Sequence, residues 1–154
     1  QNKGQIFALD IHEWKLLELK KRAKRNGAQN IQIKVIDNKL LKKFENSADR
    51  VLLDAPCSGL GVLSRNPDSK WKLTPEFIEN IKIEQAKILD QYCKMVKNGG
   101  AMVYATCSIL PSENQEQVKK FLANHPEFTL VREKQLFPSQ TGFDGFYMAY
   151  LEKK

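Results

Sequence analysis

The chain has 154 residues, of which 42% are hydrophobic and 28% charged, a composition that excludes collagen, a disordered chain and a disulfide-stapled scaffold. No apolar run approaches the roughly 18 residues of a membrane span, and the length fits one domain over residues 1–154. The net charge is +7, and residues 1–50 hold 12 basic and 6 acidic side chains, which fits a polyanionic partner such as RNA and equally a solubilising surface.

The first third of the chain alternates strand and helix patterns. Gln5–Asp10 is an apolar strand pattern that ends in an acid, and the few residues before it show no secretory signal. Trp14–Arg25 is a basic amphipathic helix pattern closed by a glycine, and Ile31–Ile36 alternates with period two, as a strand does. After a short helical stretch, Arg50–Asp54 is a compact apolar strand of the kind that is buried on both faces.

A long loop and a long helix come next. Residues 56–73 are rich in Gly, Ser, Pro and Asn, and a loop of that length indicates function. Its glycines Gly59 and Gly61 are expected to let the backbone pass close to a ligand. Thr74-Pro75 begins the helix, because Thr is a favourable N-cap and Pro suits the first helical position. Its apolar stripe continues to a stop signal at Asn98-Gly99-Gly100.

The last third of the chain contains one further helix between strands. Ala101–Ala105 is an apolar strand, and Pro111-Ser112 with Gln115 forms a capping box that begins the next helix. Phe128–Val131 and Gly145–Leu151 are closing strands, and their succession predicts an antiparallel end to the sheet. The whole order is β-α-β-α-β-α-β-α-β-β, which predicts an α/β fold with a mostly parallel sheet.

Acidic residues follow three of the predicted strands. Ligands of such sheets bind outside the carboxyl ends of the strands, where this sequence places Asp10, Asp37, Asp54 and the turn Thr106-Cys107-Ser108. Asp is a poor strand former, so this repetition exceeds what strand chemistry requires. Asp10 and Asp37 fit an acid that holds ribose hydroxyls and equally an ordinary acid at a helix N-terminus.

Two cysteines occupy corresponding positions at strand ends. In Asp54–Gly59 (DAPCSG), the end of a buried strand is followed by a rigid proline turn that presents a carboxylate and the thiol of Cys57. The same composition is also common in ordinary turns. Ala105–Ile109 (ATCSI) places Cys107 where the next strand ends. One such cysteine is more often a small core residue, as we expect for Cys93, but two at neighbouring strand ends favour a site.

The spacing of cysteines and histidines does not fit a metal site. No C-x-x-C motif occurs, and His12 and His125 have no second ligand at zinc-finger spacing, so we expect no bound metal. Three unpaired thiols fit the reducing cytoplasm, which is the expected location.

Paired thiols with a neighbouring acid suit methylation of cytosine. Carbon 5 of cytosine becomes electron-rich only after a nucleophile has added to carbon 6, and a thiolate performs that addition well. Asp54–Gly59 together with Ala105–Ile109 resembles the RsmB-like (Sun/Nol/Nop) RNA cytosine-5 methyltransferases, and the resemblance extends over almost the whole chain. Arg65–Trp71 looks like the R-x-P-D-x-x-W loop of that family, and Gly142–Leu151 is similar to its closing D-G-F-F-x-A motif, with Tyr147 in place of one Phe.

The resemblance implies an activity and roles for particular residues. The protein would use S-adenosyl-L-methionine to methylate carbon 5 of a cytosine in RNA, with rRNA as the expected substrate and tRNA as the alternative. Cys107 would be the nucleophile, Cys57 would assist product release, and Asp54 would lie near the methyl donor and the cytosine edge.

Further residues would bind the cofactor. By the same resemblance, Asp10 would hold the ribose of S-adenosyl-L-methionine and Asp37 would lie near its adenine, with Asp54 and Pro56 completing the cofactor-binding set. The glycine-rich cofactor loop of the family follows its first strand, and nothing here matches it. We therefore expect an N-terminally truncated, Rossmann-like methyltransferase sheet that lacks the first strand and this loop, and a chain that is inactive by itself.

Two other functions remain as alternatives. A non-catalytic RNA-binding fragment would use the basic helix for phosphate contacts and would not need either strand-end cysteine. A cysteine hydrolase would pair Cys107 with His125, but no oxyanion motif accompanies them. No membrane partner is expected, and the oligomeric state is taken as monomeric by default.

Overall fold

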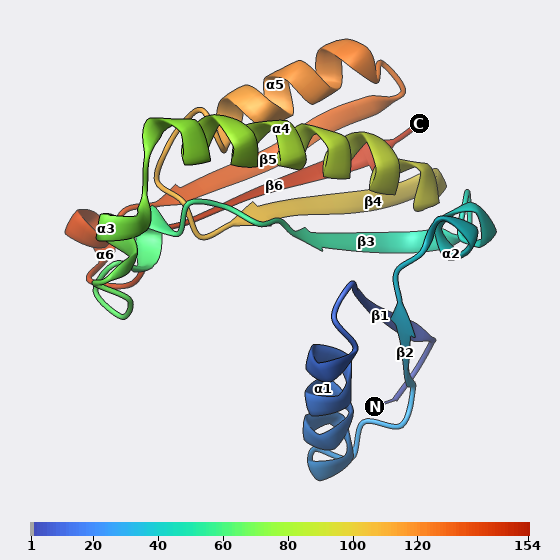
Figure 1. Cartoon of the computed structure of the whole chain (residues 1–154). Helices are drawn as coiled ribbons and strands as arrows, with labels where there is room; N and C mark the ends of the chain where they lie inside the picture. Colours follow the sequence, from blue (N-terminus) through green and yellow to red (C-terminus); the bar gives the residue numbers. More distant parts are fainter. Residues whose placement is uncertain (1) are drawn as a thin grey trace. The chain divides into compact units, whose positions relative to one another are not determined.

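The computed structural model describes residues 2–154, so Gln1 lies outside the described residues. The chain divides into two compact units, of which the first ends at Lys43 and the second spans Phe44–Lys154. The order of strands and helices is the predicted alternation, with two strands at the end (Figure 1). The strands form two separate sheets, one in each unit.

The first unit is a β-α-β arrangement followed by a short helix. Strands β1 (Ile6–Asp10) and β2 (Ile31–Val35) pair in parallel, and α1 (Glu13–Arg25) connects them. Basic side chains occupy the last turn of α1, where they complement the negative end of the helix dipole. Gly27 follows with a φ of 66°, as the predicted glycine stop requires. The short helix α2 covers Asn38–Lys43.

The second unit contains a four-stranded mixed sheet. Its strands are β3 (Ala48–Asp54), β4 (Val96–Thr106), β5 (Phe128–Leu136) and β6 (Phe146–Lys153), arranged in the order β3-β4-β6-β5. Strands β3 and β4 are parallel, whereas β6 is antiparallel to both of its neighbours. The predicted antiparallel end of the sheet is therefore confirmed.

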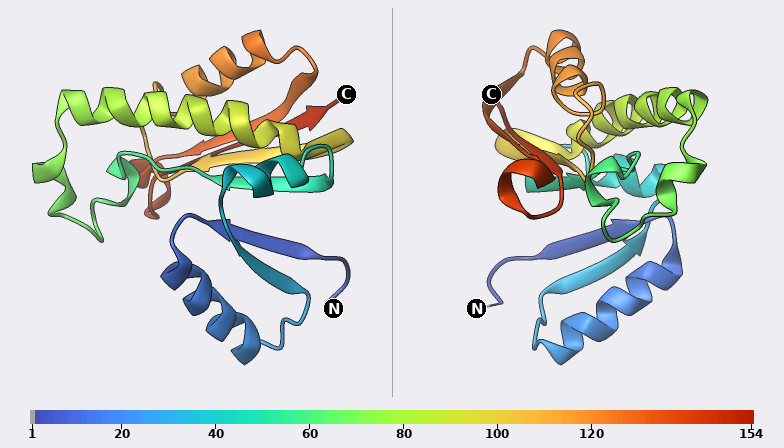
Figure 2. Two further views of the ribbon diagram at one scale, coloured as in Figure 1. Left: turned by 45° about the vertical axis from the view of Figure 1, so that its right-hand side comes forward. Right: turned by 90° about the vertical axis from the view of Figure 1, so that its left-hand side faces the viewer.

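Two helices cover one face of this sheet and enclose the core. They are α4 (Pro75–Tyr92) and α5 (Gln115–Asn124), which lie side by side in both views of the unit (Figures 1 and 2). As predicted, Thr74 caps α4, with its hydroxyl oxygen accepting a hydrogen bond from the backbone N–H of Phe77. Alternate residues of β6, namely Tyr147, Ala149 and Leu151, point into the core beneath these helices.

Short elements fill the connections. They are two 3-10 turns, η1 (Leu60–Val62) and η2 (Cys93–Met95), and two single-turn helices, α3 (Ser69–Lys72) and α6 (Pro138–Thr141). The predicted loop 56–73 therefore contains η1 and α3. No helix within residues 2–154 is long and apolar enough to cross a membrane.

Two local predictions are wrong. Strand β3 is not buried on both faces, because the side chain of its residue Leu52 is 71% exposed. The predicted stop at Gly99 and Gly100 lies inside β4, where Gly99 has a φ of 74° and the pairing with β3 shifts register. The long helix before them already ends at Tyr92.

The capping box at Ser112 does not form. Helix α5 begins at Gln115 with Asn114 at its N-cap, and that side chain makes no capping hydrogen bond. The side chains of Glu113 and Asn114 are instead fully buried and bonded to the loops that follow β3 and β4. These two residues turn inward because their partners are polar groups of the neighbouring turns.

Candidate active site

Parallel pairing of β3 and β4 brings the two strand-end cysteines together. Asp54 is paired with Ala105, and the backbone N–H of Ala55 donates to the carbonyl of Ala105 at 2.9 Å, so both strands end at the same level. The Sγ atoms of Cys57 and Cys107 are then 3.1 Å apart, and both thiols are free and half-buried. The predicted proximity of these cysteines is therefore confirmed.

The pKa values of the two thiols are shifted in opposite directions. The hydrogen bond from Cys57 lowers the pKa of Cys107 to about 7, against the opposing effects of burial and of negative charge on Asp54 and Glu113. The same hydrogen bond, together with burial, raises the pKa of Cys57 far above its ordinary value. The pair therefore loses its first proton near neutral pH and retains the second, which leaves a Cys107 thiolate beside a Cys57 thiol.

Asp54 and Pro56 lie at the exposed end of β3. Both residues are exposed, and Asp54 acts on Cys107 through its charge, which tends to raise the pKa of that thiol. The carbonyl of Pro56 accepts a hydrogen bond at 2.9 Å from the side-chain amide of Gln85 on α4. The structure thus places the carboxylate and the proline turn at the cysteine pair.

A buried carboxylate that sequence reasoning missed connects the two cysteine loops. Glu113 accepts hydrogen bonds from the hydroxyls of Ser58 and Ser108, each of which directly follows one of the cysteines. It also accepts from the backbone N–H of Ser58 at 2.8 Å and from the amide of Gln85 at 3.1 Å. An acid in the first turn of a predicted helix is usually solvated and favours the helix start, so nothing in the sequence indicates that Glu113 is buried.

A second buried group fixes the turn after β4. The amide of Asn114 donates to the carbonyl of Ser108 at 3.0 Å and to the side-chain oxygen of Gln135 at 2.8 Å. Its own oxygen accepts from the hydroxyl of Thr106 at 2.6 Å. The backbone on both sides of Cys107 is therefore held by hydrogen bonds from β4, β5 and the start of α5.

Gly61 allows three backbone segments to meet beside the cysteine pair. Its N–H donates to the carbonyl of Cys107 at 2.9 Å, and its own carbonyl accepts from the N–H of Gly145 at 2.7 Å. A Cβ atom at this position would lie 2.1 Å from the carbonyl oxygen of Gly145. The close approach that the sequence predicts toward a ligand is made to the chain's own backbone.

The closing motif is also tied to the loop that contains Asn66-Pro67-Asp68. Arg65 forms an ion pair with Asp144, and the hydroxyl of Ser64 donates to the same carboxylate at 3.3 Å. These contacts join two segments that lie 80 positions apart in the chain. Trp71, at the end of the same loop, is 79% exposed.

The other two predicted cofactor acids belong to the first unit. Asp10 ends β1, where one carboxylate oxygen accepts from the backbone N–H of His12 at 2.8 Å and the other lies 3.7 Å from the amine of Lys15. Asp37 follows β2, and its carboxylate accepts from the backbone N–H of Leu40 at 2.6 Å. The two parallel strands bring both acids to one edge of their sheet, and the acid of Asp37 also serves the start of α2.

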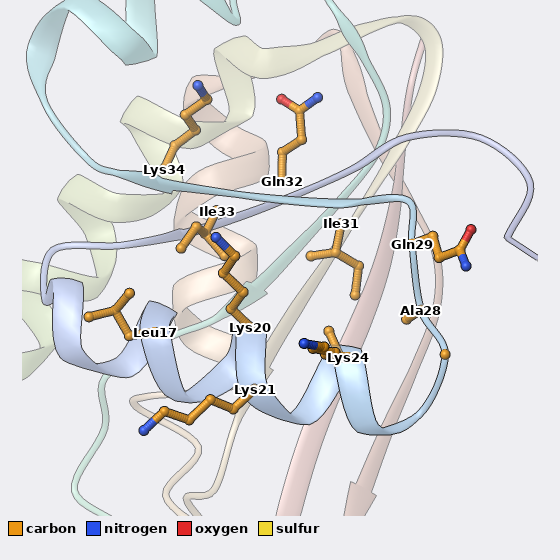
Figure 3. A pocket seen from close by; sticks show the side chains of 12 residues that line it. Leu17, Lys20, Lys21, Lys24, Ala28, Gln29, Ile31, Gln32, Ile33 and Lys34 are labelled. Atoms are coloured by element: carbon orange, nitrogen blue, oxygen red, sulfur yellow. The ribbon is translucent and has the colours of Figure 1, made fainter.

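A basic groove runs along the first unit. Its lining includes Lys20, Lys24 and Leu17 on α1, and Ile31 and Ile33, which point from β2 toward α1, whereas Lys34 points from β2 to the other side (Figure 3). This basic groove combines ammonium groups with apolar side chains. It includes α1, the helix for which the sequence predicts phosphate contacts.

The structure does not pair His125 with Cys107. The ring of His125 lies between Asp90, at 2.9 Å, and Glu127, at 3.2 Å, and its Nδ1 is 3.9 Å from the Sγ of Cys93. Cys93 is 2% exposed, and burial raises its pKa to about 11, so this thiol is a core residue, as predicted, and not an activated nucleophile. Among residues 2–154, no cluster of three His, Cys, Asp or Glu side chains could hold a metal ion.

The chain is similar in sequence to known proteins along its whole length. The family model described as 16S rRNA methyltransferase RsmB/F matches residues 1–152. The chain is 38% identical to ribosomal RNA small subunit methyltransferase B of Yersinia pseudotuberculosis serotype O:1b (strain IP 31758). That alignment covers 99% of the chain and 37% of the relative, so the chain spans about two-fifths of the relative's length.

Solved structures share the fold. NSun6 from Pyrococcus horikoshii with SFG is 28% identical and superposes with a TM-score of 0.87, covering 99% of this chain and 42% of that one. A methyltransferase homolog protein from Pyrococcus horikoshii is 25% identical, with a TM-score of 0.85 and coverage of 99% and 54%. The predicted α/β methyltransferase fold is therefore confirmed.

Proposed function

The chain belongs to the 16S rRNA methyltransferase RsmB/F family, and from this premise we propose that it methylates carbon 5 of a cytosine in rRNA through a covalent thiol adduct. The observation that carries this proposal is the pair of free thiols, 3.1 Å apart, at the carboxyl ends of two parallel strands. One thiol of the pair is acidic and the other is not, which fits two different roles in one reaction.

Cys107 is the nucleophile in this proposal. Its thiolate is available near neutral pH because Cys57 donates a hydrogen bond to its sulfur. The sulfur electron pair forms the bond to carbon 6 of the cytosine, and the electrons of the 5,6 double bond move toward carbon 5. Carbon 5 then has the electron pair that accepts a methyl group.

Cys57 promotes release of the product. After methylation, carbon 5 carries both the new methyl group and its original hydrogen. A solvent water molecule accepts that proton, the electron pair of the carbon 5–hydrogen bond restores the 5,6 double bond, and the electrons of the carbon–sulfur bond return to Cys107. Because Cys57 keeps its proton and lies 3.1 Å from the sulfur of Cys107, its hydrogen bond stabilises the departing thiolate.

The residues present fit S-adenosyl-L-methionine, which supplies the methyl group when it is bound. Asp10 and Asp37 stand at the ends of two adjacent parallel strands. Doubly wound folds place an acid that accepts hydrogen bonds from ribose hydroxyls at such a strand end, which suits Asp10, and we assign Asp37 to the adenine. Asp54 and Pro56 lie at the exposed end of β3 beside the thiols. We assign Asp54 to the space shared by the methyl donor and the cytosine edge.

Membership of an rRNA methyltransferase family implies RNA as the partner, and the lysines of the basic groove can contact its phosphates. The cytoplasm, where thiols stay reduced, suits the free Cys57 and Cys107.

The test is identification of the methylated nucleoside. A protein of the relatives' full length that carries this sequence is incubated with rRNA and S-adenosyl-L-methionine, and the RNA is digested to nucleosides for mass spectrometry. We expect 5-methylcytidine, and none with Cys107→Ala. A methyl group on another atom would contradict the cytosine-5 assignment, and RNA binding without methyl transfer by the unsubstituted protein would support the binding-only alternative.

A further inference from the structure

Glu113 is the only acidic side chain, among those that the structure describes, that is fully buried. Its relative exposure is 0%, and it lies in the turn between β4 and α5. A buried charge is costly unless hydrogen bonds compensate it, so the position calls for a physical reason.

Four donors converge on this one carboxylate. Oε1 accepts from the backbone N–H of Ser58 and from the amide of Gln85, while Oε2 accepts from the hydroxyls of Ser58 and Ser108. An ionised carboxylate offers only acceptors, which matches four donors and no acceptor. The main-chain carbonyl of Glu113 also accepts from the hydroxyl of Tyr104 at 2.8 Å, which fixes the residue to the core of β4.

The donors come from both halves of the thiol pair. Ser58 directly follows Cys57, and Ser108 directly follows Cys107. The hydroxyls of these serines are themselves 3.2 Å apart, so the two loops meet at Glu113 on one side and at the sulfur atoms on the other. Gln85 adds a connection from α4, because its amide reaches both Glu113 and the carbonyl of Pro56.

We propose that Glu113 is a positioning residue whose carboxylate holds the Cys57 loop and the Cys107 loop at hydrogen-bonding distance. This inference deepens the proposed function, because it identifies what aligns the nucleophile with the thiol that assists release. Glu113 acts on the thiols through Ser58 and Ser108, to which it is hydrogen-bonded.

The charge of Glu113 cannot by itself be what activates the nucleophile. Negative charge on Glu113 and on Asp54 raises the pKa of Cys107, whereas the hydrogen bond from Cys57 is the largest effect and lowers it. Loss of the carboxylate therefore has two opposite consequences for Cys107. Removal of the charge alone would make the thiol more acidic, and separation of the two loops would make it less acidic.

Because these two effects shift the pKa of Cys107 in opposite directions, the direction of the measured shift shows which of them dominates. The chain is treated with iodoacetamide over a range of pH, and the alkylation rate of each cysteine is followed by peptide mass spectrometry. The variants are Glu113→Gln, which removes the charge, and Glu113→Asp, which keeps the charge but is shorter by one methylene group. Glu116→Gln, at an exposed position of α5, is the matched control.

We expect Glu113→Gln and Glu113→Asp both to raise the pKa of Cys107 and to slow its alkylation at pH 7 by about fivefold, because a rise of one unit from a pKa of about 7 lowers the thiolate fraction from about one half to about one tenth. Glu116→Gln should leave the profile unchanged. A lower pKa in Glu113→Gln, with Glu113→Asp resembling the unsubstituted chain, would show that Glu113 acts through charge alone. An unchanged pKa in both variants would reduce Glu113 to a stabilising residue, and either result would overturn the proposal.

The alkylation rate of buried Cys93 shows whether a variant has unfolded. It is 2% exposed, so its alkylation stays slow while the unit is folded. If Cys93 becomes reactive in the Glu113 variants, Ser58→Ala with Ser108→Ala decides the matter, because this pair removes two of the four donors and leaves the carboxylate in place. A raised pKa of Cys107 in that double variant supports the proposal, and an unchanged pKa contradicts it. The readout requires no RNA, so the proposed methyl transfer can fail while this inference stands, and the reverse is equally visible.

Discussion

The sulfur atoms of Cys57 and Cys107 lie 3.1 Å apart although 50 positions separate these residues in the chain. The parallel pairing of β3 with β4 creates this contact. The pKa of the Cys107 thiol is nevertheless lowered, whereas that of the Cys57 thiol is raised. A hydrogen bond between two thiols has one donor and one acceptor at a time, so the two thiols differ in acidity. The different reactivities expected of the two thiols follow from this difference.

The reactivity of Cys107 should depend on pH as that of an acidic thiol does. Its pKa is lowered to about 7, and the thiolate is the reactive form, so the alkylation rate should rise with pH and reach half its maximum near 7. Cys57 should react slowly over the same range, because its pKa is raised. Iodoacetamide rates for each cysteine, measured by peptide mass spectrometry, check this.

Cys57→Ala is the control for the cause of that shift. The substitution removes the hydrogen bond that most lowers the pKa of Cys107, so the half-maximal pH should move upward, toward the ordinary thiol value of 9.0. A midpoint that stays near neutral pH in this variant would mean that another group stabilises the Cys107 thiolate.

Gly61→Ala should destabilise the second unit by about 3 kcal/mol, the upper end of the usual cost of overpacking. The added Cβ would lie 2.1 Å from the carbonyl oxygen of Gly145 and 2.8 Å from that of Cys107, and neither backbone segment can move aside alone. Urea unfolding gives the free energy of unfolding of the variant and of the unsubstituted chain.

Gly142→Ala provides the comparison. Gly142 has a φ of 69° with open space around it, so that substitution should cost only the strain of the left-handed conformation, about 1 kcal/mol. Equal losses for the two variants would show that collision at Gly61 is not what constrains this junction.

Reversal of charge in the groove of α1 and β2 should weaken RNA binding. With Lys20→Glu and Lys24→Glu together, the affinity should fall, and its dependence on salt should become less steep by about 0.7 logarithmic units for each phosphate of single-stranded RNA that the protein no longer neutralises. Filter binding at several salt concentrations measures both quantities.

The matched control places the same charges on another helix. Lys119 and Lys120 are exposed on α5, and Lys119→Glu with Lys120→Glu changes the net charge by the same amount. If both pairs of substitutions reduce the salt dependence equally, RNA responds to net charge, and the groove has no particular role.

The sequence was sufficient to predict the order of elements and the meeting of the cysteines. Apolar runs marked the strands, Thr74 and Pro75 marked the start of α4, and the strand-end positions of Cys57 and Cys107 placed both thiols at one edge of a parallel pair. Such features are local, or follow from the geometry that all parallel sheets share.

The supporting network could not be predicted, because it depends on contacts between distant segments. Glu113 looks in the sequence like a solvated residue at a helix start, and only the fold brings Ser58 and Gln85 to it. Likewise, nothing in the sequence around Gly61 indicates Gly145, which approaches from a distant segment. The capping prediction at Ser112 failed for the same reason, since tertiary partners drew the neighbouring polar side chains inward.

The central claim is that Cys107 makes the bond to cytosine and Cys57 helps to break it, and trapping of a covalent RNA adduct tests it most directly. A protein of the relatives' full length is incubated with rRNA and S-adenosyl-L-methionine at alkaline pH, where Cys107 is ionised even without Cys57, and is analysed on a denaturing gel. Cys57→Ala should accumulate a shifted band that depends on the methyl donor, whereas Cys107→Ala and the double variant should show none. A trapped adduct in Cys107→Ala but not in Cys57→Ala would reverse the two roles, and its absence from both, with equal modest losses of methyl transfer, would contradict the covalent mechanism.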